Sequence, residues 1–227
     1  FATGYNIRDL WIGSEGTVGV VSEVILRLIR RPKERKTFLA AFRSDAEALR
    51  APVELSRLGL CPSILEFLDL WTVKCVQEFT GRDVFQGLEP HPVILIELDG
   101  DSSSVEKDAL ELNAWLEENS VRSEMAENSE EAEYLWDVRR KCSPAMKKLA
   151  NTKLNEDVVV PLVEQINLVK CVNDLRDRYD LKIGVFGHCG DGNLHVNFMY
   201  DHEDQKETEA AVEALKILMD QVNKLGG

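Results

Sequence analysis

The residues best suited to chemistry lie in VFGHCGDGNLHVN, Val185 to Asn197, a stretch that holds two of the chain's four histidines. Strand patterns flank the Asp-Gly pair at 191–192, and Asp-Gly favours a two-residue type I′ hairpin turn. Such a turn would set His188 directly opposite His195, on one face and with Cβ atoms about 4.5–5.5 Å apart. Two imidazoles at this separation can bind one divalent metal, and Asn197 would lie on the same face.

Two histidines do not complete a catalytic metal site, which usually has three protein ligands and one open position. His91 stands between two prolines before a predicted strand, and His202 follows the last predicted strand in an acidic turn. Neither is an obvious third ligand. A surface hairpin whose histidines only stack or bond to their neighbours remains the structural alternative.

The hairpin must be positioned by the strands and helices around it. Within residues 37–126 the pattern strand, helix, strand occurs twice, which is the split βαβ order of a ferredoxin-like sheet. We therefore expect an α+β fold: a ferredoxin-like antiparallel sheet with helices on one face, followed by a second α/β half. The predicted strands lie at 18–29, 37–42, 62–69, 92–100, 121–126, 156–161, 181–186 and 194–200, and the predicted helices at 44–59, 70–79, 102–120, 130–149, 162–180 and 205–225.

Composition and charge restrict the class of partner and the compartment. The formal net charge of −13 would repel a phosphate backbone, so nucleic acid is not an expected partner. The five cysteines form no Cys-x-x-Cys pair, which argues against a disulfide framework or a thiolate zinc site and favours a reducing compartment. No apolar run approaches the roughly 20 residues of a membrane span, and no signal segment opens the chain. We expect a soluble protein that is cytoplasmic, peripheral at a membrane, or in the mitochondrial matrix of a eukaryote.

Four motifs in order resemble the FAD-linked oxidase family, which includes D-lactate dehydrogenase, the glycolate oxidase flavoprotein subunit and D-2-hydroxyglutarate dehydrogenase. They are GYNIRDLWIGSEGTVGVVSEVILRL at 4–28, EFLD at 66–69, LWDVRRKCSPA at 135–145 with NEDVVVP at 155–161, and GHCGDGNLHVN at 187–197. The resemblance implies a fragment of a larger two-domain flavoenzyme. Residues 1–30 would end its FAD-binding domain, and residues 31–227 would be its C-terminal substrate domain, truncated at the C-terminus.

The resemblance also implies roles for individual residues. His188 and His195 match two metal ligands, with the third ligand and the general base expected beyond Gly227. Arg139 matches the arginine that binds the substrate carboxylate, and Ser143 and Asn197 match polar positions beside the substrate. The glycine-rich loop would lie against FAD, since glycines let a backbone approach a ligand closely. Its cofactor-binding residues would be Gly13, Ser14, Glu15, Gly16, Thr17 and Gly19.

The function implied is that of an FAD-dependent 2-hydroxy acid dehydrogenase, which forms a 2-keto acid by hydride transfer to flavin. Asn155 stands where 2-hydroxyglutarate-type members carry a lysine, which favours a monocarboxylate such as D-lactate or glycolate. A divalent metal (Zn, Mn or Fe) would assist, electrons would pass to a quinone, cytochrome or iron–sulfur partner, and the fragment alone should be inactive. Two alternatives stay open: a non-catalytic metal-binding or interaction domain, and a flavin oxidase of the same fold that acts on another alcohol without metal. The oligomeric state is not indicated.

Overall fold

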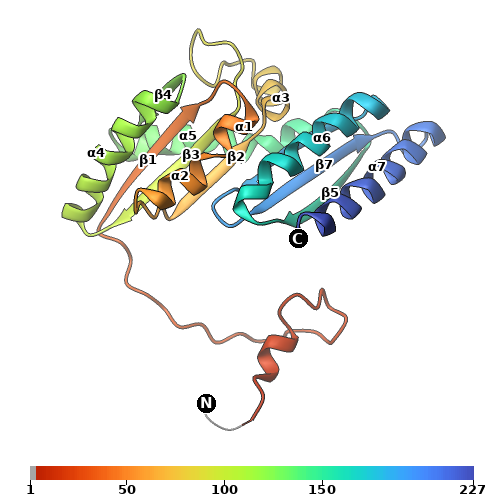
Figure 1. Cartoon of the computed structure of the whole chain (residues 1–227), viewed down its shortest axis with the longest axis horizontal. Helices are drawn as coiled ribbons and strands as arrows, with labels where there is room; N and C mark the ends of the chain where they lie inside the picture. Colours follow the sequence, from red (N-terminus) through yellow and green to blue (C-terminus); the bar gives the residue numbers. More distant parts are fainter. Residues whose placement is uncertain (1–3) are drawn as a thin grey trace. The chain divides into compact units, whose positions relative to one another are not determined.

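The computed structural model describes residues 4–227 of the chain, which divides into two compact units, Phe1–Arg31 and Pro32–Gly227. The start of the predicted FAD-binding segment, residues 1–3, lies outside the described residues. The rest of the first unit contains a short 3-10 helix, η1 (Ile7–Leu10), and no strand (Figure 1). The predicted strand at 18–29 is therefore wrong. A strand needs a neighbouring strand for its backbone hydrogen bonds, and no described strand pairs with this segment.

The second unit is built on one seven-stranded antiparallel sheet with the order β4-β1-β3-β2-β6-β7-β5. The first four strands of the chain form the predicted ferredoxin-like half, and the last three extend the sheet from β2. The α+β prediction is confirmed. The strands are β1 (Glu34–Ala41), β2 (Ile64–Leu68), β3 (Val93–Gly100), β4 (Arg122–Met125), β5 (Thr152–Val159), β6 (Lys182–His188) and β7 (Asn193–Tyr200).

Helices cover both faces of this sheet. The helices α1 (Asp45–Ala48), α2 (Ala51–Arg57), α4 (Ser102–Asn119), α6 (Gln165–Tyr179) and α7 (Gln205–Lys224) pack on one face, but the prediction that the helices lie on one face only is wrong. The helices α3 (Leu70–Thr80) and α5 (Ser129–Lys147) pack on the other face, and Figure 1 shows α5 behind the sheet. A short 3-10 helix, η2 (Leu162–Glu164), leads into α6. None of the helices within residues 4–227 is both long enough and apolar enough to cross a membrane.

Several helices begin at polar caps that the sequence supplies. Ser44 accepts a hydrogen bond from the Glu47 amide, and Asn128 accepts from the first amides of α5. The single helix predicted at 44–59 is instead two helices, α1 and α2. Pro52 lies at the start of α2, where its missing N–H is tolerated, whereas in the middle of one long helix it would break the hydrogen-bond ladder.

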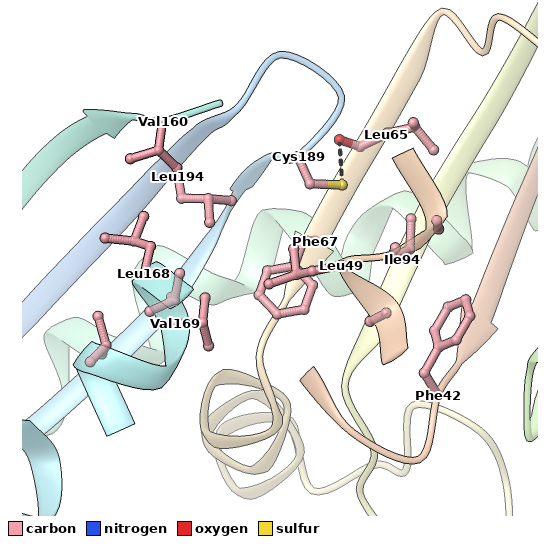
Figure 2. Close-up of a cluster of buried hydrophobic side chains, with 14 of the residues drawn as sticks. Phe42, Leu49, Leu65, Phe67, Ile94, Val160, Leu168, Val169, Cys189 and Leu194 are labelled. Atoms are coloured by element: carbon pink, nitrogen blue, oxygen red, sulfur yellow. Dashed lines mark hydrogen bonds between the residues drawn. The ribbon is translucent and has the colours of Figure 1, made fainter. Parts of the chain in front are cut away.

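The two halves of the sheet share one hydrophobic core on the side of α1, α2, α4, α6 and α7. Figure 2 shows Phe67 and Ile94 of the first half in the same cluster as Leu168 and Leu194 of the second. The strands β2 and β6 pair in register, which places Glu66 opposite His188. The core and this pairing therefore hold the hairpin beside the first half of the sheet.

Candidate functional site

The histidine hairpin has a different register from the predicted one. Phe186 pairs with His195, and His188 pairs with Asn193, so that four residues rather than two form the loop. Among the described non-glycine residues only Glu15 and Asp180 have positive φ, and a type I′ turn at 191–192 is therefore not formed. The predicted direct pairing of His188 with His195 is wrong.

The reason for the longer loop is that Cys189 is drawn into the core instead of pairing with Leu194. Its thiol is fully buried and donates to the Leu65 carbonyl of β2 at 3.4 Å (Figure 2). The buried Gln165 side chain of α6 donates to the Cys189 carbonyl at 2.9 Å. These two long-range contacts fix the loop at Cys189 and override the local preference of Asp-Gly.

The two histidines nevertheless share one face of the sheet. A shift of two residues preserves the alternation of a strand, so His188 and His195 still project to the same side. Their ring centroids are 5.3 Å apart, with the ring planes at 78°. The side is that of α3 and α5, because Phe186, which is paired with His195, packs in the cluster of those helices.

Each histidine contacts a carboxylate through Nδ1. His188 Nδ1 bonds Glu66 Oε1 of β2, and His195 Nδ1 bonds Asp157 Oδ1 of β5. An ionised carboxylate only accepts hydrogen bonds, so each ring donates from Nδ1, and in the neutral imidazole Nε2 is then the acceptor or metal ligand. The hydrogen bond from His195 holds the pKa of Asp157 below its usual value.

These two carboxylates are functional candidates for which the sequence alone assigned no role. Both stand in motifs that carry the family resemblance, EFLD and NEDVVVP, and that is the signal that could have found them. Their contacts with the histidines depend on pairings of distant strands, β2 with β6 and β5 with β7. Local pattern does not reveal such pairings.

Arg139 of α5 lies at the same site. Its Nε donates to Glu66 Oε2 at 2.5 Å, and its guanidinium carbon is 4.5 Å from the centre of the Phe186 ring. The side chain is only 17% exposed and its partner 6%, so this is not a solvated surface salt bridge. Arg139 is thus fixed on both sides, by a carboxylate and by an aromatic face.

Ser143 lies one helical turn after Arg139 and contacts Lys153 of β5. The Lys153 ammonium donates to Ser143 Oγ at 3.0 Å and lies 5.8 Å from the centre of the Phe186 ring. Burial lowers the pKa of Lys153. Lys153 is a cation of this site that the sequence did not single out.

Asn197 is fully buried, and its amide nitrogen donates to the carbonyls of His195 and Gly184 at 3.0 and 3.3 Å. Its Oδ1 has no hydrogen-bond partner among the described residues. Such an atom is costly unless a water or ligand satisfies it. Asn155 pairs with Asn197 in register and donates to Asp157 at 3.2 Å.

The predicted FAD loop belongs to the first unit and consists of two successive turns. The Ser14 amide donates to the Trp11 carbonyl, and both the amide and hydroxyl of Thr17 donate to the Ser14 carbonyl. Gly13 and Gly16 have φ of +79°, which favours glycine. A Cβ on Gly19 would lie 2.4 Å from the far end of the Trp11 ring, so a larger residue at 19 would require the Trp11 side chain to move. Cofactor binding by Gly13, Ser14, Glu15, Gly16, Thr17 and Gly19 stays a prediction.

The comparison with protein families agrees with this architecture. Residues 31–227 match the model of the FAD linked oxidases, C-terminal domain. The chain therefore belongs to the FAD-linked oxidase family, and the resemblance seen in its motifs is confirmed.

The chain is also similar to individual curated proteins. The chain is 34% identical over 225 residues to glycolate oxidase subunit GlcD of Bacillus subtilis, covering 99% of this chain and 47% of that protein. It is 28% identical over 229 residues to D-lactate dehydrogenase of Anaerostipes hadrus, covering 97% of this chain and 47% of that protein. The chain thus spans about half the length of these curated relatives.

Among solved structures, p-cresol methylhydroxylase with substrate bound has the same fold. The TM-score is 0.65 at 12% identity, over 87% of this chain and 45% of that one. At this identity the likeness concerns the fold alone.

Proposed function

We propose that this chain supplies the substrate domain of an FAD-dependent 2-hydroxy acid dehydrogenase that converts D-lactate or glycolate to the 2-keto acid. The observation that carries the proposal is the convergence of Arg139, His188 and His195 on one face of the sheet. A cation for the substrate carboxylate then lies beside two imidazoles that can ligate a metal. The similarity to glycolate oxidase and D-lactate dehydrogenase chains supports this choice of substrate.

The domain organisation proposed follows the division of the chain. Residues 1–30 would close an FAD-binding domain, and residues 31–227 would form the substrate domain. The family match over 31–227 and the separation of the two units near residue 31 support this assignment. In the first segment, the turns at 13–19 would present backbone N–H groups to FAD.

A divalent metal would be held by His188 and His195. The donor set fits, because a carboxylate on Nδ1 is the usual second partner of a metal-bound histidine. Within residues 4–227 no group of three His, Cys, Asp or Glu side chains is arranged to hold a metal ion, so the two histidines would supply two of the usual three ligands. A metal bound there would supply Lewis-acid polarisation of the substrate hydroxyl, and FAD would supply the hydride acceptor.

This chain's own residues would bind and orient the substrate. Arg139 would pair with the carboxylate, since its two Nη nitrogens make no hydrogen bond within residues 4–227. The unpartnered Asn197 Oδ1 would accept a hydrogen bond from the substrate hydroxyl or from an ordered water. Ser143, which accepts a hydrogen bond from Lys153, would line the substrate site on the side of Arg139. Position 155 carries asparagine, so no lysine at this position would bind a second substrate carboxylate. Electrons would leave the flavin for a quinone, cytochrome or iron–sulfur partner.

The experiment uses the whole protein that carries this chain. Flavin absorbance and dye reduction are measured with glycolate and with D-lactate. Arg139→Lys should raise KM about 10- to 100-fold, the equivalent of losing one charge-assisted hydrogen bond of 1.5–3 kcal/mol. Arg140→Lys is the matched control, because Arg140 binds Glu133 at 50% exposure on the same helix. A protein without flavin or hydroxy acid turnover would refute the proposal and favour a non-catalytic domain.

The metal role is tested separately by metal analysis of the same protein. His188→Ala and His195→Ala should each lower bound metal and turnover, whereas His202→Ala should change neither. His202 is exposed and contacts Thr152 and Asn151 away from the hairpin. Full turnover with unchanged metal content in all three variants would leave a flavin oxidase that works without metal.

A further inference from the structure

Among the described residues, Glu66 is the side chain that forms hydrogen bonds with both Arg139 and a hairpin histidine. It is 5% exposed, and each of its two carboxylate oxygens has a different partner. Oε1 binds His188 Nδ1, and Oε2 accepts from Arg139 Nε at 2.5 Å. The three side chains come from β2, β6 and α5 and form one chain of contacts, Arg139–Glu66–His188.

Glu66 hydrogen-bonds atoms of Arg139 and His188 that are not the ones expected to bind ligands. It binds Nε of Arg139, so the two Nη nitrogens stay free for a carboxylate, and it binds Nδ1 of His188, so Nε2 stays free for a metal. A buried carboxylate is costly unless it is paired, so Glu66 in turn depends on these two partners. If Arg139 or His188 moves away from Glu66, one carboxylate oxygen of Glu66 loses its hydrogen-bond partner. A shift of Glu66 toward one of the two residues also disturbs its contact with the other.

Asp157, the carboxylate on the other histidine, lacks this double role. Its side chain is 59% exposed, it stands on the edge strand β5, and among the hydrogen bonds of the described residues it joins His195 to Asn155 rather than to a cation. Glu66 and Asp157 therefore form a natural pair for comparison. Both orient an imidazole, but only Glu66 also holds the arginine.

We propose that Glu66 is a positioning residue of this site, and that it fixes the tautomer of His188 and the orientation of Arg139 together. The inference rests on the proposed function for its ligands, a carboxylate on Arg139 and a metal on His188. Because Glu66 binds both residues, it couples the orientation of Arg139 to the tautomer of His188. A change at Glu66 then alters both, whereas a change at Asp157 alters only His195.

The variant Glu66→Gln gives this proposal a specific outcome. A glutamine side chain has one acceptor oxygen and one NH2 group, and it would face two N–H donors. Since the arginine cannot give up its proton, the amide oxygen turns to Arg139 and the NH2 turns to His188 Nδ1. His188 then accepts at Nδ1, and its proton moves to Nε2, the atom that would otherwise be free for metal.

The tautomers are read by long-range 1H–15N NMR of the metal-free 227-residue chain. In the unmodified chain both His188 and His195 should carry the proton on Nδ1. In Glu66→Gln the His188 proton should lie on Nε2 with His195 unchanged. In the control Asp157→Asn, His188 should keep its proton on Nδ1. A residue with only a packing role would lower stability without moving this proton.

A second measurement is Zn²⁺ binding by the same chains. Loss of a second partner of a metal-bound histidine typically lowers metal affinity about 10- to 100-fold, and we expect Glu66→Gln to show a loss in this range.

A His188 proton on Nε2 in the unmodified chain, or on Nδ1 in Glu66→Gln, would overturn the proposal. Neither tautomer reading needs FAD, metal or turnover. The positioning role and the proposed enzyme function can therefore fail independently.

Discussion

The hairpin loop also depends on Gly192. Its φ is +81°, and a Cβ placed on it would lie 2.2 Å from the Val160 carbonyl oxygen. The same backbone segment accepts a hydrogen bond, because the Val160 amide donates to the Gly192 carbonyl at 3.1 Å. The loop after His188 is thus held against β5 by a contact that only glycine permits.

We expect Gly192→Ala to lower the free energy of unfolding by about 1–3 kcal/mol from the left-handed backbone alone, and further through the contact with Val160. Urea denaturation measures the loss. Gly190→Ala is the control in the same loop, because Gly190 has no positive φ and its nearest neighbour is the Leu65 side chain at 3.2 Å. Equal losses in the two variants would contradict this account.

The cysteines should differ sharply in reactivity. Burial raises the pKa of the Cys142 thiol to about 12, so that only about 1 in 10,000 is ionised at pH 8. Burial also raises the pKa of Cys75 to about 12 and that of Cys189 well above its usual value. Since the thiolate is the reactive form, these three should not react with a disulfide reagent at pH 8 until the chain unfolds.

The exposed Cys61 should supply the fast phase of this reaction, and the half-buried Cys171, whose pKa is raised by burial, a slower one. Cys61→Ser should abolish the fast phase. More than two reactive thiols in the folded chain would contradict the prediction.

The site residues that the sequence predicted are those with distinctive chemistry in a distinctive motif. His188, His195, Arg139, Ser143 and Asn197 all lie on or beside one face of β5, β6 and β7. Glu66 stands in the motif EFLD, but its local sequence gives it no role, and Lys153 stands in none of the quoted motifs. The partner of each residue comes from α5, and the sequence pattern does not reveal these contacts.

At the scale of elements, α5 carries Arg139, the proposed substrate-binding residue, and is attached to the sheet at two points one turn apart. Arg139 binds Glu66 of β2, and Trp136 Nε1 donates to Glu97 Oε2 of β3 at 3.1 Å. Glu97 is 1% exposed and also accepts from the Thr37 hydroxyl at 3.2 Å. The two buried carboxylates therefore set the position of the helix as well as that of Arg139.

Trp136→Phe keeps an aromatic ring in place but removes one donor to the buried Glu97. We expect the free energy of unfolding to fall by about 1–3 kcal/mol, measured by urea denaturation. Tyr134→Phe on the same helix is the control, since Tyr134 is 50% exposed, and surface changes usually stay within about 0.5 kcal/mol. A loss for Trp136→Phe no larger than for the control would show that the contact with Glu97 is not stabilising.

Elements were predictable where their signals are local. The helix at 130–149 and the last helix at 205–225 match α5 and α7 within two residues at each end, because caps and apolar periodicity mark them. The strand at 156–161 was placed too late in the chain, since β5 begins at Thr152. Its first residues are polar on the open face of the sheet, and so they lack the apolar signal of a buried strand.

At the scale of the whole second unit, one buried ion pair joins the two halves of the sheet. Asp69 is 0% exposed; it accepts from the Thr72 amide at 2.8 Å, which caps α3, and from Arg176 Nη2 of α6 at 2.7 Å. Burial raises the pKa of Asp69, and Arg176 opposes that rise. Arg176 also donates to the Ile183 carbonyl of β6 at 2.8 Å.

Arg176→Met leaves the Asp69 carboxylate buried without its cation, and we expect a loss of about 3–5 kcal/mol in the free energy of unfolding near neutral pH. Adding Asp69→Asn should recover part of it. When the pKa of a carboxyl is higher in the folded than in the unfolded chain, the free energy of unfolding falls as pH rises. The loss of unfolding free energy caused by Arg176→Met should therefore be smaller at pH 5 than at pH 8.

Urea denaturation at the two pH values measures these losses. Arg178→Met, an exposed neighbour on α6, is the control and should stay within about 0.5 kcal/mol. A loss that does not depend on pH would show that the charge of Asp69 is not its cause.

The order of local sequence patterns predicts the ferredoxin-like half of the sheet. It does not predict that the second half joins the first in one continuous sheet. That fusion depends on β2 pairing with β6, two strands that are far apart in the chain and have no sequence signal for each other. The family resemblance predicts that Arg139, His188 and His195 share one site. Only the pairing shows that Glu66 faces His188.

The pairing of β2 with β6 also has a kinetic consequence. The site contact between Glu66 and His188 closes a loop of 122 residues, and contacts of such high sequence separation form slowly because chain entropy is lost before they stabilise anything. Each half can complete its local hairpins and helices earlier. We therefore expect the proposed site to bind ligand only after this long-range pairing has formed, and a bound ligand would stabilise the paired state.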